Sequence, residues 1–235
     1  MAHYGTPAWT DPTPGPELSI VDRLFLLTHN PTSGKINIDL KLLGLGLVGG
    51  SLLELAIERA ISVEQDSAGQ AVVVRRTTRR DQPDAAAEYV LEQIYEAEKG
   101  RPQIQPIAYW MTELRDQVYL GVAESLRKRQ LIVAHKPTLG GVRYVPRQRY
   151  SVDDAVSQVY SLLQSPHRSR EAGERPVLLT CLVGAMGLAA TITALPQPVV
   201  SAGYPDLLGQ IWGGDALVLE QVQRLSSKLA MSRGR

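Results

Sequence analysis

Apolar side chains recur every three or four residues over most of the chain, a spacing typical of amphipathic helices. In the first such segment Leu24, Leu26 and Leu27 face one side, and Ser19 is expected to cap its N-terminus. Ser151 is expected to cap a later helix in the same way. Helices are predicted for residues 18–29, 51–61, 84–99, 110–129 (one helix or two), 152–163, 175–193, 204–212 and 216–231.

Shorter stretches alternate apolar and polar residues, which is the pattern of half-exposed strands. Residues 35–40 predict one such strand. Residues 62–65 with 71–76, and 131–133 with 142–145, predict two hairpins, and Gly140-Gly141 supplies turn chemistry for the second. Helices outnumber strands, so the predicted class is mainly α: a single globular helical-core domain over residues 18–232 with short β-hairpins. Residues 1–17 form a proline-rich segment expected to be a disordered tail.

The composition changes this picture little. The 235 residues carry 25 basic and 24 acidic side chains, a formal charge of +1, so no overall charge attracts nucleic acid or an anionic membrane. The lone Cys181 cannot form an internal disulfide, and the N-terminus lacks the pattern of a secretory signal, which predicts a cytoplasmic protein. The apolar run 177–195 is interrupted by glycine and threonine, which favours a buried helix over a transmembrane span.

The sharpest motif is a glycine pattern at residues 44–49, GLGLVG, which matches the GxGxxG of dinucleotide-binding loops. It follows a predicted strand, precedes a predicted helix, and has Glu64 and Asp66 about twenty residues later. An NAD-dependent dehydrogenase is therefore one alternative. The strands that a doubly wound sheet needs are absent from the prediction, so the favoured interpretation is a glycine-rich start that lets the helix of residues 51–61 pack closely.

Other candidate groups have simpler structural interpretations. Glu54 and Glu58 stand one helical turn apart, as paired carboxylates in catalysis do, but Glu54 is expected to bond backbone in the core and Glu58 to be solvated. Asp153 and Asp154 suit the acidic first turn of a helix, and Cys181 suits an inert core position. The histidines, His29, His135 and His167, lack metal-ligand spacing. The sequence thus identifies no catalytic residue, no metal site and no cofactor, and a non-enzymatic protein is favoured.

Two features are candidates for contact with a membrane or a partner. The most basic run comprises Arg75, Arg76, Arg79 and Arg80, and such a run attracts anionic surfaces. The tip of the second predicted hairpin carries Leu139, which suits insertion into a membrane or contact with a second copy of the chain, giving a homo-oligomer. The helix before that hairpin resembles a winged-helix arrangement, but acidic residues on it argue against nucleic-acid binding.

Several segments, in order, resemble the Golgi phosphoprotein family and its bacterial relatives. The opening LFLLTH with Gly34-Lys35 is similar to the family's first helix and turn, and GLVGGSLLELA to its glycine-rich helix. Further matches, spread over about residues 18–232, are PIAYW at 106–110, the helix-to-hairpin step at 126–133, SPHR at 165–168 and WGGD at 212–215. The resemblance implies a helical core with a projecting hairpin, phosphatidylinositol 4-phosphate as ligand in eukaryotic members, and a role in sorting glycosyltransferases. The predicted tail, residues 1–17, contains no lysine or arginine, and in this respect it is more similar to the family's bacterial relatives than to its eukaryotic members.

The resemblance also implies where a headgroup site would lie, and this chain departs from it. The family's tryptophan and three arginines correspond here to Asp39, Val48, Asp116 and Tyr119. Two of the four are acids, which repel phosphate, so specific phosphoinositide recognition is not expected. Arg115, one residue away, and Lys41 or Lys35 are candidate phosphate contacts.

Two functional hypotheses remain at this stage. The first is a peripheral membrane or partner-binding domain with a degraded headgroup site and a contact surface of Arg75, Arg76, Arg79, Arg80 and Leu139. The second is an enzyme or small-molecule binder that has recast the family pocket for a small apolar ligand, with Trp110 nearby.

Overall fold

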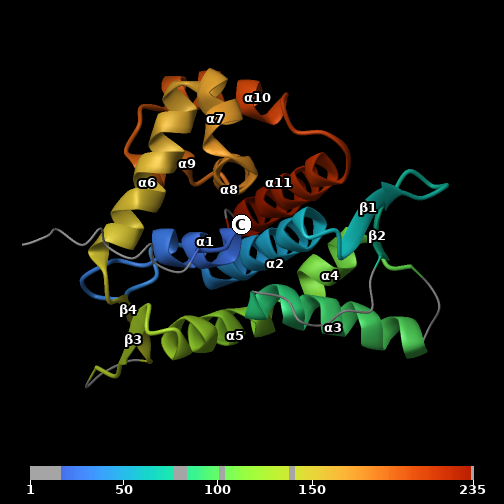
Figure 1. The fold of residues 1–235 in the computed structure, drawn as a ribbon, viewed down its shortest axis with the longest axis horizontal. Coiled ribbons are helices and arrows are strands. Elements are labelled where there is room, and N and C mark those ends of the chain that lie inside the picture. The colour runs from blue at the N-terminus through green and yellow to red at the C-terminus, as the bar shows by residue number, and fades with distance from the viewer. Residues whose placement is uncertain (1–16, 77–83, 101–103, 138–140, 234–235) are drawn as a thin grey trace, which may run out of the picture.

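The computed structural model describes residues 17–76, 84–100, 104–137 and 141–233. It confirms a mainly α single domain: the described residues form helices and two small antiparallel sheets (Figure 1). The helices are α1 (Ile20–Thr28), α2 (Leu40–Ile57), α3 (Ala85–Gly100), α4 (Ile107–Glu113), α5 (Arg115–Lys128), α6 (Arg149–Gln164), α7 (Ser169–Ala172), α8 (Glu174–Ala185), α9 (Ala189–Thr193), α10 (Gln197–Leu208) and α11 (Gly213–Arg233). A 3-10 turn, η1 (Pro166–Arg168), precedes α7. The predicted tail lies, except for Glu17, outside the described residues.

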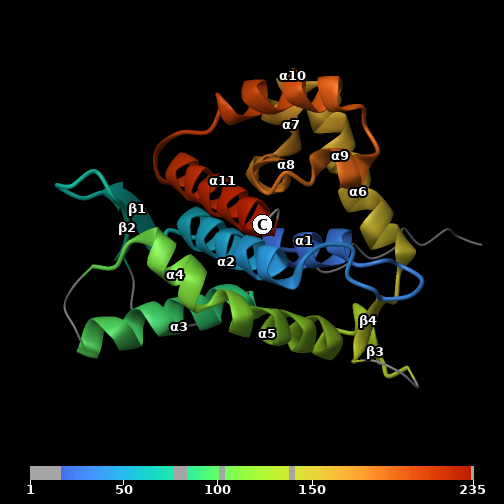
Figure 2. The same cartoon turned by 180° about the vertical axis from the view of Figure 1, so that it is seen from behind.

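Helix α2 is the centre of the fold. It is apolar nearly all round, which is the character of a helix covered on every side, and it contacts α1, α3, α5, α8 and α11. Figures 1 and 2 show α3 and α5 on one side of it and α11 on the other. In the described residues α2 is the one helix long and apolar enough to cross a membrane, and 72% of it is buried within the fold. That burial is typical of the core helix of a globular domain.

The glycine pattern lies inside α2, so two sequence predictions were wrong. The helix begins at Leu40, with Asp39 as its N-cap, and residues 44–49 are helical rather than a loop or a glycine-rich start. Residues 35–40 likewise form no strand; Ile36 makes one isolated bridge with His29. A dinucleotide loop needs free backbone N–H groups at a helix N-terminus, and this pattern instead stands one to two turns inside a buried helix. The cofactor-loop interpretation fails for that reason.

The prediction that the glycines of residues 44–49 allow close helix packing is confirmed. A Cβ at Gly44 would lie 2.0 Å from the carbonyl oxygen of Arg115, and a Cβ at Gly46 would lie 2.5 Å from the Met186 side chain. Such separations are far inside van der Waals contact. Side chains larger than hydrogen are therefore excluded where α5 and the end of α8 cross α2.

Three further helix boundaries differ from the prediction. The expected helix of residues 175–193 breaks at Gly187, whose φ of 72° ends α8 and separates it from α9. Helix α10 begins at Gln197 rather than at 204, because Pro198 at its start is compatible with a first turn. Helix α6 begins at Arg149 after Gln148, so Ser151 lies within the helix and does not cap it. Ser19 does cap α1, in a capping box with Asp22.

The two predicted hairpins form, and they lie at opposite ends of the molecule (Figures 1 and 2). In the first, β1 (Ile61–Gln65) pairs with β2 (Ala71–Arg75); in the second, β3 (Ile132–His135) pairs with β4 (Arg143–Pro146). Both are antiparallel. The β1–β2 hairpin packs beside α11 and α4, whereas the β3–β4 hairpin continues from the end of α5.

Candidate functional site

Two of the four positions that the family resemblance assigns to a headgroup site have structural roles in α2. The Asp39 carboxylate accepts a hydrogen bond from the Leu42 backbone N–H at 3.0 Å, which satisfies one free donor of the first turn. Val48 is fully buried in the middle of the helix. Val48 therefore presents no atom to a ligand at the surface.

Two basic residues predicted as phosphate contacts, Lys41 and Arg115, lie where α2 and α5 begin. Gly44 packs directly on the Arg115 backbone, and exposed Lys41 lies one turn earlier on α2. Arg115 Nε stands 3.6 Å from a carboxylate oxygen of Asp116, its exposed neighbour. Two acids, Asp116 and Asp39, thus stand in the same region as these two cations. Such a balance gives a phosphate group little net attraction.

Tyr119, the fourth position, belongs to a stack of aromatic rings that joins α1, α5 and β4. Its ring lies 5.9 Å from His29 and 6.1 Å from Tyr144, and Phe25 stacks on His29 at 4.0 Å. His29 Nδ1–H donates to the Phe25 carbonyl at 2.6 Å, which leaves Nε2 to accept the Tyr119 hydroxyl at 3.1 Å. The Tyr119 side chain therefore contacts both His29 and Tyr144, and it holds the β3–β4 hairpin in place.

Burial in the stack favours the neutral forms of His29 and Tyr119. Burial lowers the pKa of His29 to about 4, and the bond to the Phe25 carbonyl opposes this only in part. Burial also raises the pKa of Tyr119 to about 12. Neither group changes its charge near pH 7, so the stack suits a rigid support rather than acid–base chemistry.

The register of the β3–β4 hairpin sorts its side chains between core and solvent. Ile132 and Pro146 form one cross-strand pair and are buried. Because faces alternate along a strand, the pairs Val133–Val145 and His135–Arg143 share the opposite, outer face. Val133 is 44% exposed there, and Val142, just before β4, is 50% exposed.

Basic residues surround the β3–β4 hairpin. Lys136 follows β3, Arg147 follows β4, and Lys35 follows Gly34, which packs on the Tyr144 carbonyl. Within the described ranges, Lys35, Lys136, Arg143 and Arg147 have no ion-pair partner, whereas nearby Arg127 and Arg149 pair with Glu124 and Asp153. We call the set comprising Lys35, Val133, Lys136, Val142, Arg143 and Arg147 the hairpin surface.

The basic run predicted as a contact surface is only partly described. Arg75 Nε donates to Glu98 at 2.7 Å and its guanidinium lies over the Tyr95 ring, while Arg76 pairs with Glu64. Both arginines lie at the β1–β2 end, away from the β3–β4 hairpin (Figure 1). Arg79, Arg80 and Leu139 lie outside the described residues.

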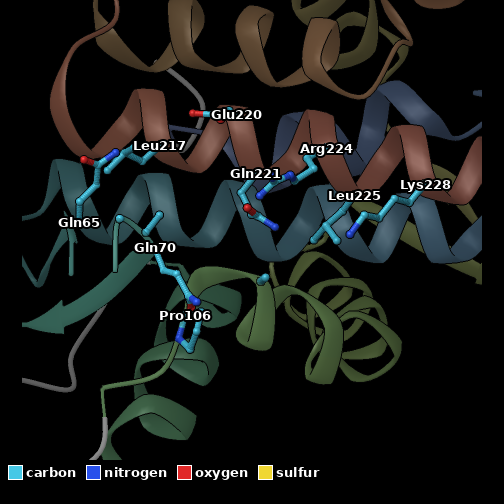
Figure 3. Close-up of a pocket in the computed structure, with 12 residues that line it drawn as sticks. Gln65, Gln70, Pro106, Leu217, Glu220, Gln221, Arg224, Leu225 and Lys228 are labelled. Carbon is cyan, nitrogen blue, oxygen red and sulfur yellow. The ribbon is translucent and has the colours of Figure 1, made fainter. Parts of the chain in front are cut away.

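Three cavities open onto the described surface. One of about 270 Å³ is lined by Asp39, the turn after α8 and the end of α11. A groove of about 440 Å³ beside α7 and α8 includes Trp212, which is 80% exposed, and Asp215, whose pKa burial and Glu174 raise to about 6. A third of about 310 Å³ lies between the β1–β2 hairpin and α11 (Figure 3). Of the four positions assigned to the family site, Asp39 lines the first of these cavities, Val48, Asp116 and Tyr119 line none of the three, and Trp110 is buried.

The carboxylates and the thiol considered for catalysis are structural. Glu54 accepts the Ile20 backbone N–H at 2.6 Å, as predicted, and Arg175 bridges Glu54 to Glu58 at 3.0 and 2.7 Å. Glu58 is therefore ion-paired rather than simply solvated. Cys181 is fully buried and burial raises the pKa of its thiol to about 12, which confirms an inert position. Across the described residues, acids, histidines and Cys181 form no group of three suited to a metal ion.

Sequence reasoning missed two sets of residues. Arg224 and Lys228 stand one turn apart on α11 and line the third cavity; their i,i+4 spacing was the available signal. The grouping of the hairpin-surface cations was also missed: Lys35 was considered only as a phosphate contact, and the strand pairing is needed to show which cations gather around the exposed valines.

The fold and its surfaces define a class: a mainly helical single domain with exposed cations and exposed apolar residues. Comparison with known families makes this specific, because residues 20–223 match the family described as Golgi phosphoprotein 3 (GPP34). The chain belongs to that family, which confirms the resemblance drawn from its separate segments. A search of the curated proteins finds no match to the chain. Membership supports a partner- or lipid-binding role at the level of the family.

Proposed function

We propose that the chain is a cytoplasmic, non-enzymatic peripheral membrane protein that binds anionic lipid through the hairpin surface. The observation that carries the proposal is a set of four cations around the β3–β4 hairpin that have no acidic partner among the described residues, near exposed Val133 and Val142. An anionic leaflet attracts each basic residue near it by about 1 kcal/mol. Apolar side chains between such cations add affinity by entering the headgroup region.

The proposed binding responds to surface charge and does not select a phosphoinositide headgroup. Val48 is buried, Tyr119 is held by His29, and Asp39 and Asp116 bring negative charge to the remaining two positions. Without convergent cations, phosphatidylinositol 4-phosphate has no advantage over other lipids of equal total charge. The headgroup site of the family is, in this proposal, degraded.

Flotation with liposomes tests both parts. We expect the protein to float with anionic liposomes at low salt, to float less at high salt because charges are screened, and to show no preference for phosphatidylinositol 4-phosphate at matched charge. Arg143→Glu should weaken binding roughly tenfold or more, since reversing one charge removes about 2 kcal/mol near the surface. Val133→Asp should weaken it as well.

Matched controls lie away from the hairpin. Arg170→Glu changes an exposed cation on α7, and Ile104→Asp changes an exposed apolar residue before α4; both should float like the original protein. Equal losses in the controls would show a dependence on overall charge and would refute a hairpin contact. Selective flotation with phosphatidylinositol 4-phosphate would refute the degraded site.

A further inference from the structure

The third cavity has walls from three separate parts of the chain. The turn end of the β1–β2 hairpin contributes Gln65 and Gln70, the start of α4 contributes Pro106 and Ala108, and α11 forms the remaining wall. Its volume of about 310 Å³ is at the small end of ligand pockets. Its β1–β2 wall lies at the opposite end of the molecule from the β3–β4 hairpin (Figure 1), and Figure 3 shows the residues that line it.

Helix α11 presents two cations to this cavity. Arg224 and Lys228 are four residues apart and therefore lie on the same side of the helix, together with Gln221 and Leu225. Figure 3 shows these side chains extending from α11 on the side that faces Gln70 and Pro106, with Glu220 on the far side of the helix. The cationic groups thus stand nearer the cavity's interior than the one carboxylate at its edge.

Several side-chain donors of the cavity have no hydrogen-bond or ion-pair partner among the described residues. Several arginines of the described chain are paired, such as Arg129 with Asp22 at 2.6 Å and Arg175 with Glu54 at 3.0 Å. Arg224 and Lys228 have no carboxylate within ion-pair distance in the described ranges, and the side-chain amides of Gln65, Gln70 and Gln221 have no hydrogen-bond partner there. The cavity wall therefore carries two cations and three amides with free donors.

We propose that this cavity is a binding site for a small organic phosphate. Arg224 and Lys228 would bind the phosphate oxygens by charge-assisted hydrogen bonds, and the glutamine amides would complete the set of donors. Leu217, Leu225 and Pro106 form an apolar wall for the organic part of the ligand. The site shares no residue with the hairpin surface and operates whether or not that surface binds a membrane.

Isothermal titration calorimetry with glycerol 3-phosphate, and with glycerol as the uncharged probe, tests this site. We expect saturable heat with the phosphate and none with glycerol. The double variant Arg224→Gln with Lys228→Gln should weaken binding at least tenfold, because each charge-assisted bond contributes on the order of tenfold. Arg170→Gln, an exposed cation elsewhere, should bind as the original protein does. All three substituted positions are exposed, so thermal unfolding should be unchanged.

Gln221→Leu separates a built site from general positive charge. It should weaken binding severalfold through the loss of one neutral donor while the dependence on salt stays the same. Liposomes with phosphatidylinositol 4-phosphate form a second arm, in which the ligand phosphate belongs to a lipid: loss of flotation in the Arg224→Gln, Lys228→Gln variant would assign the site to a headgroup. The proposal is overturned if neither probe depends on Arg224 and Lys228, or if the original protein binds neither.

Discussion

At the residue scale, His29 shows how packing settles the protonation state of a side chain. The residue is 1% exposed and its ring stacks on Phe25 and Tyr119, where a charged imidazolium would lose its hydration. The sequence supported only the statement that His29 lacks metal-ligand spacing. Its partners Tyr119 and Tyr144 are distant along the chain, so the stack could not be predicted from local pattern.

His29→Gln tests the neutral ring through pH dependence. A folded pKa of about 4 lies below the ordinary value of 6.5, so the unfolded chain binds the proton more readily. The contribution of His29 to stability is therefore complete above pH 6.5 and falls as the pH drops toward 4, by about 2–3 kcal/mol. Glutamine does not titrate, so the difference in unfolding free energy between the two proteins, measured by urea denaturation, should shrink by that amount between pH 7 and pH 4.

A constant difference across this pH range would mean that His29 titrates alike in the folded and unfolded chain. The stack would then admit water or a counter-charge, contrary to the buried geometry. Asp215 titrates in the same window with the opposite sign, but it is common to both proteins and cancels in the comparison.

At the element scale, the hairpins were more predictable than the central helix. Alternation and turn residues located β1–β2 and β3–β4 within a residue or two of their ends. The start of α2 was misplaced because glycine lowers helix propensity and the GxGxxG pattern suggested a loop. Tertiary packing overrides that propensity: Gly44 and Gly46 stand where other elements cross α2, and no local signal contains that information.

Two glycine-to-alanine substitutions in helices should have opposite effects. Gly44→Ala places a methyl group 2.0 Å from the Arg115 carbonyl oxygen and should destabilise the fold by about 2–3 kcal/mol or more. Gly121→Ala in α5 meets nothing within 4 Å and should stabilise it by about 0.5–1 kcal/mol through helix propensity. Thermal and urea unfolding give both values. Equal effects would contradict the close crossing of α2 and α5.

At the scale of the whole molecule, the formal charge of +1 does not show that the basic residues gather on separate surfaces. The fold brings the cations of the hairpin surface together from the turn at Lys35, β4 and the segments flanking both strands, while Arg75 and Arg76 lie at the other end and are paired with acids. The family and the mainly α class could be predicted from ordered sequence segments. The positions of whole helices and strands decide which basic residues share a face. That grouping could not be predicted from the sequence.

The most direct measurement of the central claim places a fluorophore on the hairpin. Cys181 is the sole cysteine and is fully buried with a pKa near 12, so Val133→Cys can be labelled selectively with an environment-sensitive maleimide dye. Ile104→Cys, exposed at the β1–β2 end, is the matched control. On adding anionic vesicles we expect a blue shift in emission at position 133 and none at position 104. No shift at 133, or equal shifts at both, would contradict membrane contact through the hairpin surface.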